Sequence, residues 1–167
     1  VTFLGTGAFN GCTALTSATV GDGIMKLQKD TFSNCSALKT VNLSEGLTTI
    51  ESYVFYNCAS LKAIVIPNSV SVIGNYAFCD CVSMTEITLG EELTTIGNYA
   101  FYNCYGLKAV SFPEELSTIG EFAFQKCAAL KTVVLHDNIT NLGKSVFRDC
   151  TGLAEVTIGD GITEIPD

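Results

Sequence analysis

The chain contains 167 residues (17.8 kDa), enough for one domain of ordinary size, and none of its apolar runs reaches the roughly 20 residues of a membrane helix. Apolar residues make up 47% of it and charged residues 16%, a composition that excludes a chain disordered through low hydrophobicity. The formal net charge is −8 and the nine Lys and Arg residues are scattered, which argues against a nucleic-acid partner. Because its apolar runs are short, we expect no membrane insertion of this segment.

A period of 23 residues runs through the whole chain. Seven repeats follow one another without an insertion or deletion and leave six residues at the end, a regularity typical of a solenoid. Two columns mark the period most clearly, and they are Phe9, Phe32, Phe55, Phe78, Phe101, Phe124 and Phe147, and Cys12, Cys35, Cys58, Cys81, Cys104, Cys127 and Cys150.

Each repeat divides into two predicted segments. Alternating apolar positions such as Ile64 and Ile66 predict a short strand, which Pro67 or Pro113 ends because proline lacks an N–H. The second half, 73–81, spaces its apolar residues by three and four, and this spacing predicts a short 3₁₀ or single-turn helix. We expect tight turns with positive φ at Gly5, Gly74, Gly97, Gly120 and Gly143, and we consider a second, weaker row of strands through Ile50, Ile73, Ile96 and Ile119.

The segment 61–81 resembles the BspA-type (treponemal-type) leucine-rich repeat, with the pattern Leu-x-x-Ile-x-Ile-Pro-x-x-Val-x-x-Ile-Gly-x-x-Ala-Phe-x-x-Cys. The resemblance covers essentially the whole chain. It implies a leucine-rich-repeat solenoid of the α/β repeat class, rich in β-structure: seven repeats in a curved right-handed superhelix, with a parallel concave sheet and short 3₁₀ or helical convex segments. Departures from the pattern include Thr31 in place of Ala and the non-glycine residues Gln28 and Glu51.

The resemblance also implies a function and a location. Such repeats belong to bacterial cell-surface and secreted proteins that bind host or extracellular proteins and adhere to them. We therefore expect a non-enzymatic binding or adhesion module, extracellular or on the cell surface, with no cofactor. Residues 1–167 are expected to form one repeat array within a longer protein, with exposed core side chains at both ends that favour end-to-end or edge association.

Two surfaces are candidates for partner binding. The outward positions of the strands are expected to face the concave side, and the candidate residues there are Lys39, Lys62, Lys108, Lys131, Glu86, Thr88, Asn42 and Ser111. A convex aromatic column forms the second candidate surface, with Tyr56 and Tyr102 three residues further on, and it consists of Tyr53, Tyr76, Tyr99 and Phe122. Aromatic rings favour carbohydrate binding as an alternative function. A purely structural stalk or spacer is the other alternative.

The cysteines are expected to form a buried ladder of free thiols. Seven of them share one column, and stacked repeats give their Cβ atoms parallel directions, whereas a disulfide needs Cβ atoms that face each other. The same geometry argues against a zinc site, which needs four converging ligands. Cys79 lies outside the column, beside the tyrosines, where both an exposed reactive thiol and a partly buried one are compatible with the pattern.

No catalytic or metal-binding residue is predicted. His136 and Asp137 lie in a repeat turn without a nucleophile elbow, so we interpret His136 as a surface residue. A column of carboxylates lies just past the strands, where a solvated rim is favoured over calcium binding, and it contains Asp22, Glu45, Glu91, Glu114, Asp137 and Asp160.

Overall fold

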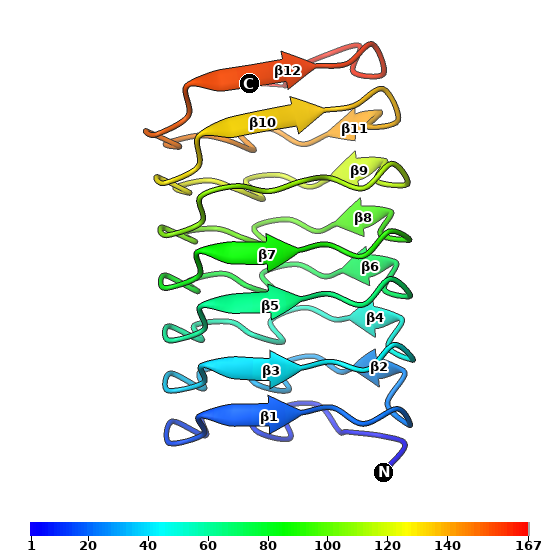
Figure 1. The fold of residues 1–167 in the computed structure, drawn as a ribbon, viewed down its shortest axis with the longest axis vertical. Coiled ribbons are helices and arrows are strands. Elements are labelled where there is room, and N and C mark those ends of the chain that lie inside the picture. Colours follow the sequence, from blue (N-terminus) through cyan, green and yellow to red (C-terminus); the bar gives the residue numbers. More distant parts are fainter. Residues whose placement is uncertain (167) are drawn as a thin grey trace.

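The structure is a computed structural model that describes residues 1–166, and in it the chain winds into seven stacked coils (Figure 1). Equivalent residues of neighbouring coils are 23 positions apart, and every strand pairing in the solenoid is parallel in that register. The coils comprise residues 1–23, 24–46, 47–69, 70–92, 93–115, 116–138 and 139–161, called coils 1 to 7 below. The predicted repeat solenoid is therefore confirmed.

The coils carry strands on two faces. The strand face is formed by β1 (Ser17–Thr19), β3 (Thr40–Asn42), β5 (Ala63–Val65), β7 (Glu86–Thr88), β10 (Thr132–Leu135) and β12 (Glu155–Ile158). The second face is formed by β2 (Lys26–Leu27), β4 (Thr49–Ile50), β6 (Val72–Ile73), β8 (Thr95–Ile96), β9 (Thr118–Ile119) and β11 (Asn141–Leu142). Figure 1 shows the strand face in front and the shorter strands behind it.

The two faces differ from the expectation in their continuity. The second face, considered as a weaker row, is one uninterrupted sheet of six strands in the order β11-β9-β8-β6-β4-β2. The strand face instead consists of three separate pairs, β1 with β3, β5 with β7, and β10 with β12. Coil 5 contributes no strand to this face among the described residues, and its residues 109–111 run as irregular chain there.

The prolines explain two of the gaps in the strand face. In coil 7 the N–H of Gly159 donates to the carbonyl of Leu135 at 2.7 Å and so ties the ends of β10 and β12 together. Pro67 in coil 3 and Pro113 in coil 5 occupy the position of Gly159 and have no N–H to donate. Pairing lapses between coils 2 and 3 and between coils 4 and 5, at the two prolines. At the third gap the His136 ring bonds the carbonyl of Pro113 at 2.8 Å.

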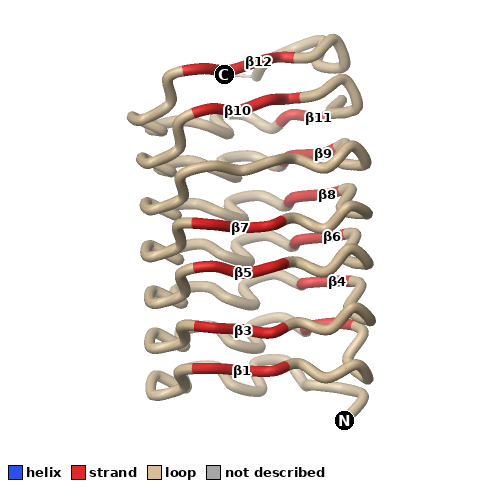
Figure 2. Tube along the Cα trace, in the orientation of Figure 1, coloured by secondary structure: helices blue, strands red, loops and turns tan. Residues whose placement is uncertain are grey.

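The expected 3₁₀ or helical segments are turns, and no helix occurs among residues 1–166 (Figure 2). Individual bonds from residue i to i−3 do form, as from the N–H of Cys81 to the carbonyl of Phe78. They do not continue into a helix because two columns per repeat, represented by Tyr76 and Asp80, have φ near +60°. Both of these residues turn their N–H groups toward the next coil, where they donate to Asn98 and Tyr102 carbonyls at 2.9 Å.

The expected positive φ at the repeat glycines is wrong. Only Gly7 and Gly11 have positive φ among the glycines, whereas Gly74 and its equivalents do not. These glycines instead allow two backbone segments to approach closely, because a Cβ on Gly74 would lie 2.6 Å from the carbonyl carbon of Glu51 in the preceding coil. Glycine therefore lets the backbones of consecutive coils meet at the corner after the second face.

The core is a set of side-chain ladders that run along the solenoid. The rings of the phenylalanine column stack with centroids 5.0–5.7 Å apart, and the rings of Phe55, Phe78, Phe101 and Phe124 are fully buried. Thr31 replaces Ala in a buried column and donates its hydroxyl to the carbonyl of Gln28 at 2.6 Å, which satisfies the extra polar atom.

Candidate binding surface

The cysteine ladder is a structural feature and not a reactive site. All eight cysteines are free thiols, and only Cys12, in coil 1, is exposed. From Cys35 to Cys150 each thiol of the ladder donates to the carbonyl of the phenylalanine 26 residues earlier, at 3.1–3.3 Å. Burial raises the pKa of Cys58 to about 12 and that of Cys150 to about 11, so both remain protonated at neutral pH. The predicted buried thiol ladder is confirmed for six of its seven cysteines, all but Cys12, and the hydrogen bond explains why cysteine suits this column.

Cys79 is buried as well, so the exposed reactive thiol considered for it is wrong. Its side chain is 3% exposed, and its Sγ lies 3.5 Å from Oδ2 of Asp80. Burial, with the Asp80 carboxylate next in effect, raises the pKa of Cys79 far above its usual value.

No metal centre is formed by the acidic column. Across residues 1–166, no group of three or more His, Cys, Asp and Glu side chains is arranged to hold a metal ion. Asp137 instead accepts a hydrogen bond from the N–H of Asp160 at 2.8 Å, and Asn68 accepts one from the N–H of Glu91 at 3.2 Å. These side chains therefore support the turns that follow the strand face.

His136 is held by the backbone and not by Asp137. Its Nε2 lies 2.8 Å from the carbonyl of Pro113, and a carbonyl can only accept, so Nε2 carries the proton. Its Nδ1 is buried without a partner. The ring therefore lies partly buried between coils 5 and 6, more enclosed than the surface residue expected from the sequence.

The aromatic column forms a continuous stack. The rings of Tyr53, Tyr76, Tyr99 and Phe122 lie 4.7–4.8 Å apart and within 18° of parallel. The ammonium groups of Lys29 and Lys144 lie 5.5 and 5.6 Å from the two terminal ring centroids. Sugar binding by stacking needs a free ring face, and here each face contacts a neighbouring ring or a lysine. The geometry thus weighs against the carbohydrate alternative.

The candidate residues of the strand face are all solvent-exposed, and they lie on or beside its strands. Lys39, Lys62, Lys108 and Lys131 form one line across the coils, just before the strands begin, and the others project from the strands or from 109–111. Exposed apolar side chains lie among them, with Val65 at 65% and Val134 at 57% exposure. The structure brings the eight candidates together on one surface.

The four lysines of this line differ from the other basic residues. Lys26, Lys144 and Arg148 pair with carboxylates, while Lys29 and Lys126 lie over aromatic rings. Of the nine Lys and Arg side chains, the four in the line are the ones without an ion pair or ring contact in the described chain. Sequence reasoning identified the line but had no signal for its lack of partners.

Two hollows open on the strand face where its pairing lapses. The first, of about 290 Å³, lies between coils 2 and 3 and is lined by Thr40, Val41, Asn42, Leu43, Glu45, Ala63, Ile64, Val65 and Pro67. The second, of about 340 Å³, lies between coils 4 and 5 and is lined by Thr85, Glu86, Ile87, Thr88, Lys108, Ala109, Val110 and Ser111. The hollows were not predicted, although Pro67, which lines the first, was a signal that could have located it.

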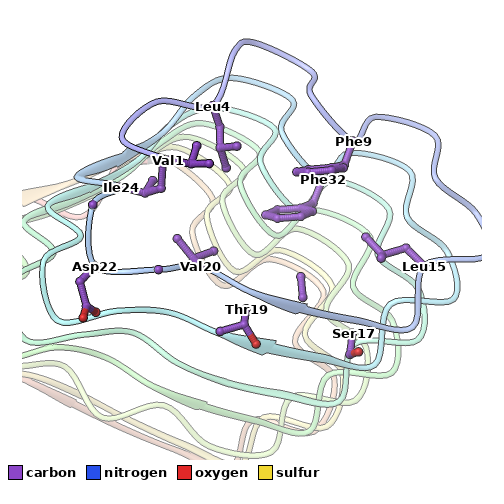
Figure 3. Close-up of a pocket in the computed structure, with 13 residues that line it drawn as sticks. Val1, Leu4, Phe9, Leu15, Ser17, Thr19, Val20, Asp22, Ile24 and Phe32 are labelled. Atoms are coloured by element: carbon purple, nitrogen blue, oxygen red, sulfur yellow. The ribbon is translucent and has the colours of Figure 1, made fainter.

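A larger hollow of about 610 Å³ opens at coil 1 (Figure 3). The side chains of Val1, Leu4 and Val20 point into it, with the stacked rings of Phe9 and Phe32 at one side. At the opposite end of the solenoid Val156 and Ile158 are 44% and 47% exposed. Core side chains are thus exposed at both ends, as expected from the sequence.

Comparison with known proteins agrees with the fold. The T. pallidum leucine-rich repeat protein is 29% identical, with a TM-score of 0.82 over 89% of this chain and 70% of its own. A Bacteroides ovatus leucine-rich repeat protein (24% identity, TM-score 0.61) and the pneumococcal vaccine antigen PcpA (21%, 0.58) share the fold over 98% and 89% of this chain. This chain spans 63% and 52% of those two proteins, less than two thirds of each.

No curated protein matches the chain. The described residues include no apolar helix long enough to cross a bilayer. The family model of the BspA-type leucine-rich repeat region, a repeat scaffold and not a catalytic family, matches six copies over residues 1–84 and 71–167. The chain therefore belongs to the BspA-type leucine-rich repeat family.

Proposed function

We propose that the chain is a non-enzymatic protein-binding module of a bacterial surface or secreted protein, and that it binds host or extracellular proteins through the strand face. The line of four lysines without intramolecular partners carries this proposal. The chain has a net charge of −8, yet these four exposed lysines form no ion pair within it, so they are available to pair with an acidic partner. The family membership and the likeness to a vaccine antigen support a surface location.

A titration on immobilised fibronectin and fibrinogen tests the proposal. The wild type is compared with K62E/K108E, which reverses two lysines of the line, and with K29E/K144E, which changes the net charge equally beside the aromatic stack. We expect saturable binding that K62E/K108E weakens by about tenfold or more and K29E/K144E leaves nearly unchanged. Equal weakening by both variants would point to net charge alone, and absence of saturable binding would favour the structural spacer.

A further inference from the structure

The two hollows at the prolines extend the proposed function to a definite kind of partner. Each hollow has an apolar floor between two coils, formed by Val41 and Ile64 in the first and by Ile87 and Val110 in the second. Across the second gap the backbone bond from Lys108 N–H to the Thr85 carbonyl persists at 3.3 Å, at the edge near the lysines. The second hollow therefore begins beside Lys108 in the lysine line and extends along the chain to Ser111.

The distance between the two hollows matches the distance between two residues on one face of an α-helix. They lie two coils apart, or about 10 Å at the separation of neighbouring strands. Residues i and i+7 of an α-helix lie on one face about 10.5 Å apart. A helix laid along the long axis of the solenoid would thus present two apolar side chains at the separation of the two hollows.

The position of the lysines sets the charge of such a helix. Lys62 and Val65 are three residues apart along the strand, or about 10 Å, which is close to the diameter of a helix with its side chains. A helix over the hollows would therefore face the lysine line with one flank and the carboxylate column, of which Glu45 lines the first hollow, with the other. Glu86 and Glu155 in the adjacent column oppose four lysines, so the line keeps a net positive charge of two. An acidic flank complements it.

We propose that the strand face binds an acidic amphipathic helix of a partner protein, with apolar side chains seven residues apart seated in the two hollows, one between coils 2 and 3 and one between coils 4 and 5. This inference rests on the proposed function, since it specifies the partner for the same face. Helix-in-groove binding of this kind depends on a few apolar anchors, with charge complementarity fixing the orientation.

The probe is a labelled 18-residue Glu- and Ala-rich helical peptide with two leucines seven positions apart, followed by fluorescence anisotropy. Two control peptides have the same composition with the leucines five positions apart, or alanines in their place. We expect the first peptide to bind saturably and about tenfold or more tighter than either control. Equal binding of all three peptides would overturn the inference, because it would show attraction by charge alone.

A pair of variants tests the hollows themselves. P67S/P113S restores the missing N–H groups with the residue that Ser44 provides in coil 2, whose strand is paired. Closing the sheet should remove the hollows and weaken peptide binding by about tenfold, without lowering the unfolding midpoint. Unchanged binding by a folded P67S/P113S protein would refute the inference.

A second variant keeps the prolines. A109W should fill the hollow between coils 4 and 5, whereas N141W places the same ring on β11 of the second face, away from the strand face. Loss of peptide binding in A109W and its retention in N141W would support the inference, and equal effects would contradict it. If the matrix proteins bind saturably and the peptides do not, this inference fails while the proposed function stands; if neither binds, both fail.

Discussion

Truncation of a phenylalanine in the middle of the stack should cost far more stability than the same change at its end. Phe101 is fully buried between the rings of Phe78 and Phe124, at centroid distances of 5.2 and 5.0 Å. Phe9 is 39% exposed and stacks on Phe32 alone, at 5.4 Å. Replacement by alanine removes the same atoms at both positions, so the difference between the two losses of unfolding free energy gives the contribution of the second neighbouring coil.

The magnitudes follow from burial. For F101A we expect a loss of about 3–5 kcal/mol of unfolding free energy, the usual cost of a Phe→Ala cavity in a core. For F9A, with about three fifths of the ring buried and solvent already on one side, we expect about 1–2 kcal/mol. Guanidinium-induced unfolding followed by far-UV circular dichroism gives both values.

The dependence of the unfolding free energy on denaturant is measured in the same experiment. A repeat array is stabilised by contacts between neighbours, so loss of coil 1 alone would lower this slope for F9A, whereas F101A acts on the middle of the array. Equal destabilisation by the two variants would refute the reasoning that each coil derives its stability from the coils on both sides.

Three further predictions concern the corner glycines and the thiols. G74A should lower the unfolding free energy by about 1–3 kcal/mol, because its Cβ would lie 2.6 Å from backbone atoms of Glu51 and Ser52. G5A should leave the unfolding free energy nearly unchanged, because no atom lies within 4 Å of the added Cβ. Equal unfolding midpoints of the two variants would contradict this prediction. A thiol reagent should modify one cysteine, Cys12, in the native protein and all eight after unfolding, as counted by mass spectrometry; rapid native labelling of Cys79 would disprove its burial. The contribution of the buried thiols to the unfolding free energy should be constant below pH 9 and fall between pH 9 and about 12, because unfolded thiols ionise near 9 while burial raises the pKa of Cys58 to about 12. C58A should therefore show a smaller fall over this range, and an equal one would exclude this thiol as a cause.

Much of the fold was predictable because the signals are local and repeated. Apolar alternation before Pro67 predicts a strand, and the same columns recur in every repeat, so stacking follows from one unit. The backbone conformation of the turns was not predictable. Tyr76 carries the positive φ, an uncommon state for a residue with a Cβ, because its N–H bonds the next coil and its ring stacks on Tyr53 and Tyr99.

The candidate surface was only partly accessible from the sequence. The outward position of Lys62 and Lys108 follows from strand alternation and the repeat register. That these lysines have no ion pair or ring contact, unlike Lys29, which lies over Tyr53, can be seen only in the folded chain. Lys29 and Tyr53 are 24 residues apart and meet through stacking of the coils, a contact that no local pattern specifies.

By itself the sequence determined the period, the core columns and the free thiols, because each depends on one side chain repeated in one orientation. Only the tertiary structure decided which face is the continuous sheet, why glycine is needed at the corners and where the strand face opens. These features depend on the distance between backbones of neighbouring coils. A single missing N–H at Pro67 or Pro113 removes a bond between residues 24 positions apart, and the pairing of the two coils lapses there.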